Sequence, residues 1–188
     1  FIPAELCFGA RGRFFARSLD IDMKLLGSCM VAAAQHKGAA IVEVLVNCVI
    51  FNDGVHKGVA DRATREERSI VLRHGEKMIF GKEKNKGIVL DGLRLKAVTI
   101  GEDGYTLDDV LTHDALEEDP TLHTMLAMMG TNDDMPVAMG VIRDVAGISY
   151  DEAVTQQIEE VKAQKPGIRK LEDVLLKEAY WEVKAEDL

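Results

Sequence analysis

One apolar stretch decides the fold of this chain: Ala39-Ala40-Ile41-Val42-Glu43-Val44-Leu45-Val46, followed by Asn47-Cys48-Val49-Ile50-Phe51-Asn52-Asp53. Its first part is rich in β-branched residues, which predicts a buried β-strand. Open α/β sheets bind ligands beyond the carboxyl ends of their strands, so this strand would carry Cys48 to a ligand-binding edge. A thiolate there could hold iron. Cys48 cannot build an iron–sulfur cubane alone, because the cluster needs four protein ligands, so its partners would lie mostly outside this chain.

The residues before this stretch predict the other two elements of a βαβ unit. Phe14-Phe15-Ala16-Arg17 indicates a short strand that ends before Ser18. From Met23 to His36, apolar residues recur at helical spacing, and Gly38 follows the last turn. Strand, helix and strand joined by tight loops predict a parallel sheet.

Shorter elements follow residue 54. The pattern predicts extended segments at 69–72, in two pieces within 80–90, at 95–100 and at 136–143. It predicts helices at 106–111, 120–129, 149–163 and 171–176. We therefore expect two parts: an α/β part at 1–54 and an irregular α+β extension at 55–188.

Composition excludes several classes of protein. A net charge of −9 argues against binding to duplex nucleic acid, which requires a basic stripe. No apolar run approaches the roughly 20 residues that span a bilayer, and no secretory signal is present. Three cysteines in a chain without such a signal indicate the reducing cytoplasm. The chain begins with Phe1, not methionine, and we expect it to be part of a longer polypeptide.

Cys48 is the strongest single candidate for chemistry, because no complete active-site motif is present. The alternative is that Cys48 is a small buried hydrophobic residue, as we expect for Cys7 and Cys29. His113-Asp114 could act as an oriented base or simply close a turn, and His123 lies on an apolar helical segment that predicts a core or interface position.

Two further groups of residues have alternative interpretations. The methionines between 125 and 139 suggest an adaptable core or a subunit interface more than a redox surface. The Lys82–Lys86 turn is a local positive spot on an acidic chain, either a solvated loop or a surface that attracts an acidic partner.

The sequence resembles the thiamine-diphosphate-binding β subunit of 2-oxoacid:ferredoxin oxidoreductases, most closely the 2-oxoglutarate enzymes. The resemblance covers essentially the whole chain, and its motifs are specific in their order and spacing. They are Ile2-Pro3-Ala4, Phe14-Phe15-Ala16-Arg17, Gln35-His36-Lys37-Gly38, Asn47-Cys48-Val49-Ile50-Phe51-Asn52-Asp53-Gly54, His74-Gly75-Glu76-Lys77-Met78-Ile79-Phe80-Gly81, Lys86-Gly87-Ile88, His113-Asp114, Pro136-Val137-Ala138-Met139-Gly140-Val141-Ile142-Arg143 and Ser149-Tyr150-Asp151.

The resemblance implies that 1–54 is the C-terminal part of a parallel α/β thiamine-diphosphate domain and that Cys48 ligates a [4Fe-4S] cluster. It also implies oxidative decarboxylation of a 2-oxoacid with coenzyme A, with electrons passing to ferredoxin, in a hetero-oligomer with a companion α subunit. The other cluster cysteines and the residues for thiamine diphosphate and Mg²⁺ belong to the family's N-terminal half. No catalytic or thiamine-binding residue is therefore assigned to this chain, which we expect to be inactive alone.

The chain departs from the family's pattern at two places. Ala138 replaces a usual proline, and Gly147-Ile148-Ser149 replaces an Arg-Pro-Thr-like stretch. Two alternatives also stay open: a pyruvate or general 2-oxoacid enzyme, and a non-catalytic module that only packs against a partner subunit.

Overall fold

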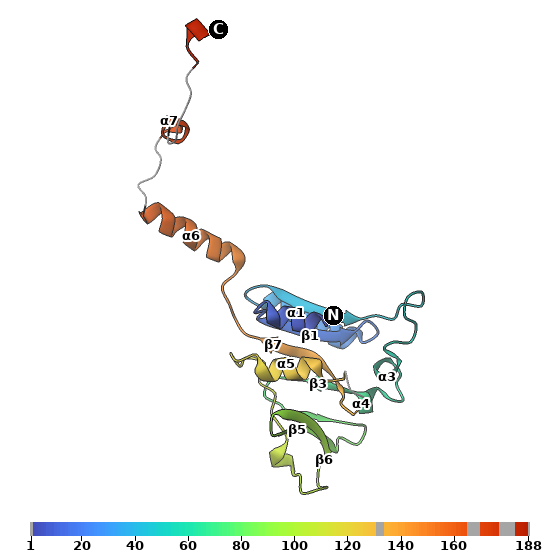
Figure 1. Ribbon diagram of the computed structural model, residues 1–188. Helices are drawn as coiled ribbons and strands as arrows, with labels where there is room; N and C mark the ends of the chain where they lie inside the picture. Colours follow the sequence, from blue (N-terminus) through green and yellow to red (C-terminus); the bar gives the residue numbers. More distant parts are fainter. Residues whose placement is uncertain (1, 131–133, 165–169, 177–182, 188) are drawn as a thin grey trace. The chain divides into compact units, whose positions relative to one another are not determined.

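A computed structural model describes residues 2–130, 134–164, 170–176 and 183–187 of the chain (Figure 1). They fall into two units, Phe1–Ser149 and Tyr150–Leu188. The second unit contains α6 (Tyr150–Gln164), α7 (Leu171–Leu175) and a short 3-10 helix, Ala185–Asp187. The helices predicted at 149–163 and 171–176 are thereby confirmed.

The predicted βαβ unit is present in the first unit. β1 (Phe14–Leu19) leads into α2 (Met23–Gln35), and β2 (Ala40–Leu45) returns parallel to β1. The α/β fold class inferred from the sequence is therefore confirmed.

Local capping and packing explain where α2 lies. The side chain of Asp22 accepts a hydrogen bond from the Leu25 N–H at 3.1 Å and begins the helix. Cys29, further along the helix, is buried against Phe14 and Ala16 of β1. The helix thus covers one face of the first two strands.

The main sheet is mixed rather than wholly parallel. Its strand order is β2-β1-β7-β3, with β3 formed by Ser69–Leu72 and β7 by Val137–Asp144. β7 runs antiparallel to β1 and parallel to β3. Strands that precede residue 54 and strands that follow it therefore share one sheet in the first unit. The division of the protein into domains at residue 54 stays a prediction.

β2 is not the buried strand that its sequence predicts. Its first two residues are exposed and the other four are half-buried, whereas all six residues of β1 are buried. The reason is position, because within the described residues β2 lies at the end of the strand order while β1 lies between two neighbours.

β1 is also longer than predicted, because Arg17 is accommodated inside the sheet. Its guanidinium pairs with Glu43 of β2 and donates hydrogen bonds to the carbonyl oxygens of Ala127 at 3.1 Å and Ala138 at 3.3 Å. A buried cation with these partners can continue a strand, and β1 runs on to Leu19.

A smaller antiparallel sheet supplies much of the core. It consists of β4 (Ile79–Phe80), β5 (Lys86–Asp91) and β6 (Arg94–Thr99), in that order. The remaining elements are α1 (Pro3–Gly9), α3 (Lys57–Ala60), α4 (Arg65–Arg68), a 3-10 helix at Leu107–Asp109 and α5 (Thr121–Met128). Met78 and Met129 are buried in the core that these elements share, in keeping with a packing role for methionine.

Candidate functional site

Cys48 lies in the segment that joins β2 to α3, which projects from the end of the main sheet (Figure 1). Its side chain is exposed, while Cys7 and Cys29 are buried. The alternative of Cys48 as a buried hydrophobic residue is therefore wrong, and the packing role of Cys7 and Cys29 is confirmed. Cys48 as a metal ligand stays a prediction.

The loop around Cys48 is closed by the side chain of Asn47. The amide nitrogen of Asn47 donates to Asp53 Oδ1 at 2.9 Å, and its oxygen accepts from the Gly54 N–H at 2.8 Å. Within this closure, the Asn52 N–H donates to the Cys48 carbonyl oxygen at 3.0 Å. The three hydrogen bonds hold 47–54 as a defined turn.

This turn directs backbone donors toward the sulfur of Cys48. Hydrogen bonds from the N–H groups of Phe51, Ile50 and Asn52 hold the pKa of the Cys48 thiol below its usual value. Burial instead raises the pKa of the Cys7 and Cys29 thiols. Metals bind the thiolate form, so the donor chemistry of Cys48 is that of a ligand for iron.

The same turn presents a group of apolar side chains to solvent. Val49 is 74% exposed, Ile50 82% and Phe51 90%. Large contiguous apolar patches are uncommon on the surface of a free domain and mark interaction sites. The Cys48 loop therefore combines a thiol of lowered pKa with an apolar surface suited to burial by other residues.

The described residues do not form a complete metal site around Cys48. Among the residues that the structure describes, no three His, Cys, Asp or Glu side chains are grouped as a metal site would require. The exposed thiol of Cys48 fits one ligand position of an iron–sulfur cluster, and this role stays a prediction. The chain also lacks a Gly-Asp-Gly motif, so nothing in it fits the diphosphate–magnesium end of thiamine diphosphate.

His113, the histidine considered as a possible base, and two further histidines pack within the fold. His113 is buried, its Nε2 lies 2.9 Å from the Val141 carbonyl oxygen, and burial lowers its pKa. His123 is buried as expected from its apolar segment. His36 caps the end of α2, and its Nδ1 lies 2.7 Å from Asp144 Oδ1.

The Lys82–Lys86 turn is attached to α4 by one carboxylate. Glu67 accepts hydrogen bonds from the Lys82 N–H at 2.8 Å and from Lys86 Nζ at 2.7 Å. The bond from Lys86 is the main cause that lowers the pKa of Glu67. The positive charge of Lys86 is thus partly neutralised.

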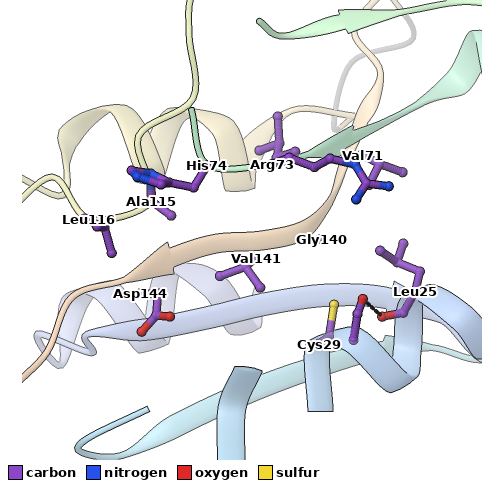
Figure 2. A pocket seen from close by; sticks show the side chains of 12 residues that line it. Leu25, Cys29, Val71, Arg73, His74, Ala115, Leu116, Gly140, Val141 and Asp144 are labelled. Atoms are coloured by element: carbon purple, nitrogen blue, oxygen red, sulfur yellow. Dashed lines mark hydrogen bonds between the residues drawn. The ribbon is translucent and has the colours of Figure 1, made fainter. Parts of the chain in front are cut away.

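Cavities of several sizes lie near these elements. One of about 250 Å³ adjoins the base of the Cys48 loop, where it is lined by residues including Asn47 and Gly54. A larger one, of about 350 Å³, lies on the α2 side of the main sheet (Figure 2). The sequence pattern did not identify Asn47 as the residue that closes the Cys48 loop. Its two hydrogen-bond partners, Asp53 and Gly54, nevertheless lie in the same quoted motif, six and seven residues further along the chain.

One curated protein is similar to almost the whole chain. The chain is 33% identical over 184 residues to 2-oxoglutarate oxidoreductase subunit KorB of Mycobacterium tuberculosis. The match covers 97% of this chain and 48% of that protein, so the chain spans about half the length of this relative. No family model and no solved structure matches.

The strand order and the helices define the class of the chain as an α/β protein, and it carries an exposed cysteine. The similarity is more specific, because it relates the chain to the C-terminal part of a 2-oxoglutarate oxidoreductase subunit. The resemblance inferred from the sequence motifs is thereby confirmed. Separately, no helix among the described ranges is long and apolar enough to cross a membrane.

Proposed function

We propose that this chain is the C-terminal part of the β subunit of a 2-oxoglutarate:ferredoxin oxidoreductase. The observation that carries the proposal is the exposed Cys48 in a loop of backbone donors, in a chain similar to a 2-oxoglutarate oxidoreductase subunit. Neither feature is sufficient alone, because a reactive cysteine has many uses and the chain spans only about half of the relative.

In the proposed reaction the 2-oxoacid loses CO₂, its acyl group forms a thioester with coenzyme A, and two electrons pass singly to ferredoxin. Thiamine diphosphate, with Mg²⁺, supplies the carbanion chemistry, and a [4Fe-4S] cluster the one-electron steps, when they are bound. The remainder of the polypeptide supplies the other cluster cysteines. It also supplies the residues that hold thiamine diphosphate and Mg²⁺. This chain alone is inactive.

The role of this chain is to present one cluster ligand. Cys48 would hold one iron as a thiolate, and the N–H groups of Ile50, Phe51 and Asn52 would stabilise negative charge on its sulfur. The exposed side chains of Val49, Ile50 and Phe51 pack against the companion α subunit or the rest of the domain and exclude water from the metal. The assembly is a cytoplasmic hetero-oligomer.

Cys48→Ser in the intact complex tests the ligand role. We expect the content of iron and acid-labile sulfide to fall and ferredoxin reduction to be lost, because a ligand is removed. Cys29→Ser is the matched control, since Cys29 is buried in the α2 packing and is expected to change only stability. Unchanged iron and sulfide in the Cys48 variant would overturn the ligand assignment.

A pyruvate or general 2-oxoacid enzyme is the second candidate. The relative's name supports 2-oxoglutarate. Comparing kcat/KM of the complex for 2-oxoglutarate and pyruvate decides between them. A complex with no cluster and no turnover of either acid would instead favour the non-catalytic interaction module.

A further inference from the structure

A buried polar cluster holds 113–119 against β7 in the first unit. Arg143 of β7 donates from Nη1 to the Glu117 carbonyl oxygen at 2.7 Å and from Nη2 to that of Glu118 at 2.9 Å. His123 of α5 lies with Nε2 2.7 Å from the Asp114 carbonyl oxygen. Arg143 is 4% exposed and His123 1%, whereas the carbonyl groups that they contact belong to exposed residues, so these bonds are partly shielded from water.

The geometry requires that His123 be neutral. Arg143 Nη1 lies 2.8 Å from His123 Nδ1, and a guanidinium nitrogen can only donate. Nδ1 must therefore be the acceptor, which leaves the ring proton on Nε2 to be donated to Asp114. The ring has no free position for a second proton while Arg143 remains in place.

The groups around His123 shift its pKa in both directions. Burial lowers the pKa of His123, and the cation of Arg143 on β7 lowers it further. The hydrogen bond to the Asp114 carbonyl and the carboxylates of Asp114 and Glu117 raise it, but the net shift is downward. His113 lies beside it with the two ring centroids 6.2 Å apart, and burial lowers the pKa of His113 as well. The carboxylate of Asp119 also interacts electrostatically with His123.

The segment held by this cluster forms one wall of the larger cavity. Figure 2 shows Ala115 and Leu116 on one side of the space and Leu25 and Cys29 of α2 on the other. The strand between them is β7, whose Asp144 N–H donates to the Ala115 carbonyl oxygen at 2.7 Å. Movement of 114–118 would therefore widen the cavity.

We propose that His123 is a protonation-controlled latch for the 114–118 segment. When Nδ1 takes a proton from solvent, Arg143 loses its acceptor and faces a second cation in a buried position. The segment then separates from β7, and the cavity opens. Because the pKa of His123 is lowered while the segment is closed, protons bind the open segment more tightly. The latch is therefore closed above the usual pKa of a histidine, and opening increases as the pH falls below it.

Hydrogen exchange of the 188-residue chain tests the latch. Between about pH 7.5 and about pH 5.5, we expect exchange of amides in 114–118, corrected for intrinsic chemistry, to rise at least about tenfold relative to amides of β5. His123→Asn should abolish this rise, because its Oδ1 can still accept from Arg143 but does not titrate. His74→Asn tests the competing histidine, because His74 is exposed and its Nδ1 lies 3.3 Å from the Ala115 nitrogen and 3.2 Å from Asp114 Oδ1. The rise should persist in this variant.

NMR titration of His123 in the unchanged chain keeps the proposal testable if His123→Asn does not fold. The midpoint of its ring resonances should coincide with the midpoint of segment opening. Separate midpoints, no acid-dependent exchange, or a rise that persists in His123→Asn would each overturn the proposal. A rise abolished only in His113→Asn or His74→Asn would also overturn it.

Discussion

At the scale of the residue, Cys48 differs from the other two cysteines through its surroundings and not through its sequence neighbours. All three follow or lie within apolar segments, but only Cys48 is exposed among backbone N–H groups. Those donors lower the pKa of its thiol, whereas burial raises the pKa of Cys7 and Cys29. The position of a cysteine relative to backbone donors therefore decides whether it is suited to bind metal.

Asn47→Ala should weaken this environment. Loss of the bonds to Asp53 and Gly54 frees the turn, so the N–H groups no longer converge on Cys48 and the pKa of its thiol rises. We expect alkylation of Cys48 by iodoacetamide at neutral pH to slow about threefold or more, because only the thiolate reacts.

Asn85→Ala, in a different turn, is the control for this experiment, and its alkylation rate should equal that of the unchanged chain. The profile of rate against pH should shift to higher pH only in the Asn47 variant. Equal profiles would show that the turn does not depend on the Asn47 amide.

At the scale of the element, β7 pairs with both β1 and β3, and it contains a glycine whose backbone conformation would be strained for any other residue. Gly140 has φ of +88°, and a Cβ there would lie 2.6 Å from the Leu72 carbonyl oxygen of β3. The register between β1 and β7 also shifts near this position, between Phe15 and Ala16. Only glycine permits both the conformation and the close approach of the two strands.

Gly140→Ala should therefore destabilise the chain by about 2–4 kcal/mol, because conformational strain adds to a steric clash. Gly92→Ala is a matched control: Gly92 has φ of +62°, but a Cβ added there would meet no other atom within 4 Å. We expect it to cost about 1 kcal/mol, from backbone strain alone. Urea unfolding measures the free energy of unfolding of both variants. An equal loss of stability in the two variants would show that β3 shifts to accommodate the added methyl group at no energetic cost.

At the scale of the whole molecule, the charge of the chain is acidic, with one basic turn beside the smaller sheet. The net charge is −9, which would repel an acidic ferredoxin in general. Glu67 attaches the turn and pairs with Lys86, so Lys82 and Lys84 are the residues to test for steering of such a partner. Charges at the rim of an interface act mainly on the rate of association.

Replacing Lys82 and Lys84 with glutamine in the complete complex should slow ferredoxin reduction at low salt by about two- to fivefold and have less effect at high salt. Reduction of an uncharged dye should be unchanged, because it needs no electrostatic docking. An equal fall with both acceptors would indicate a role in folding or assembly. No change with either would identify the turn as solvated surface only.

The sequence by itself determined the elements whose signals are local. The β-branched run before Cys48 and the helical spacing of 23–36 each specify one element through neighbouring residues, and the structure contains both. The helix predicted at 106–111 is present as the shorter 3-10 helix Leu107–Asp109. The family motifs likewise lie in the linear order of the chain, and the resemblance inferred from them agrees with the 33% identity to a 2-oxoglutarate oxidoreductase subunit.

Only the tertiary structure decided which strand is central, which cysteine is exposed and which histidines are neutral. β2 has the more apolar sequence but lies at the edge, while β1 carries Arg17 and is buried. These outcomes depend on partners far along the chain, such as Ala127 for Arg17 and Arg143 for His123. Burial and hydrogen bonding are properties of residues brought together by folding, so a local pattern cannot specify them.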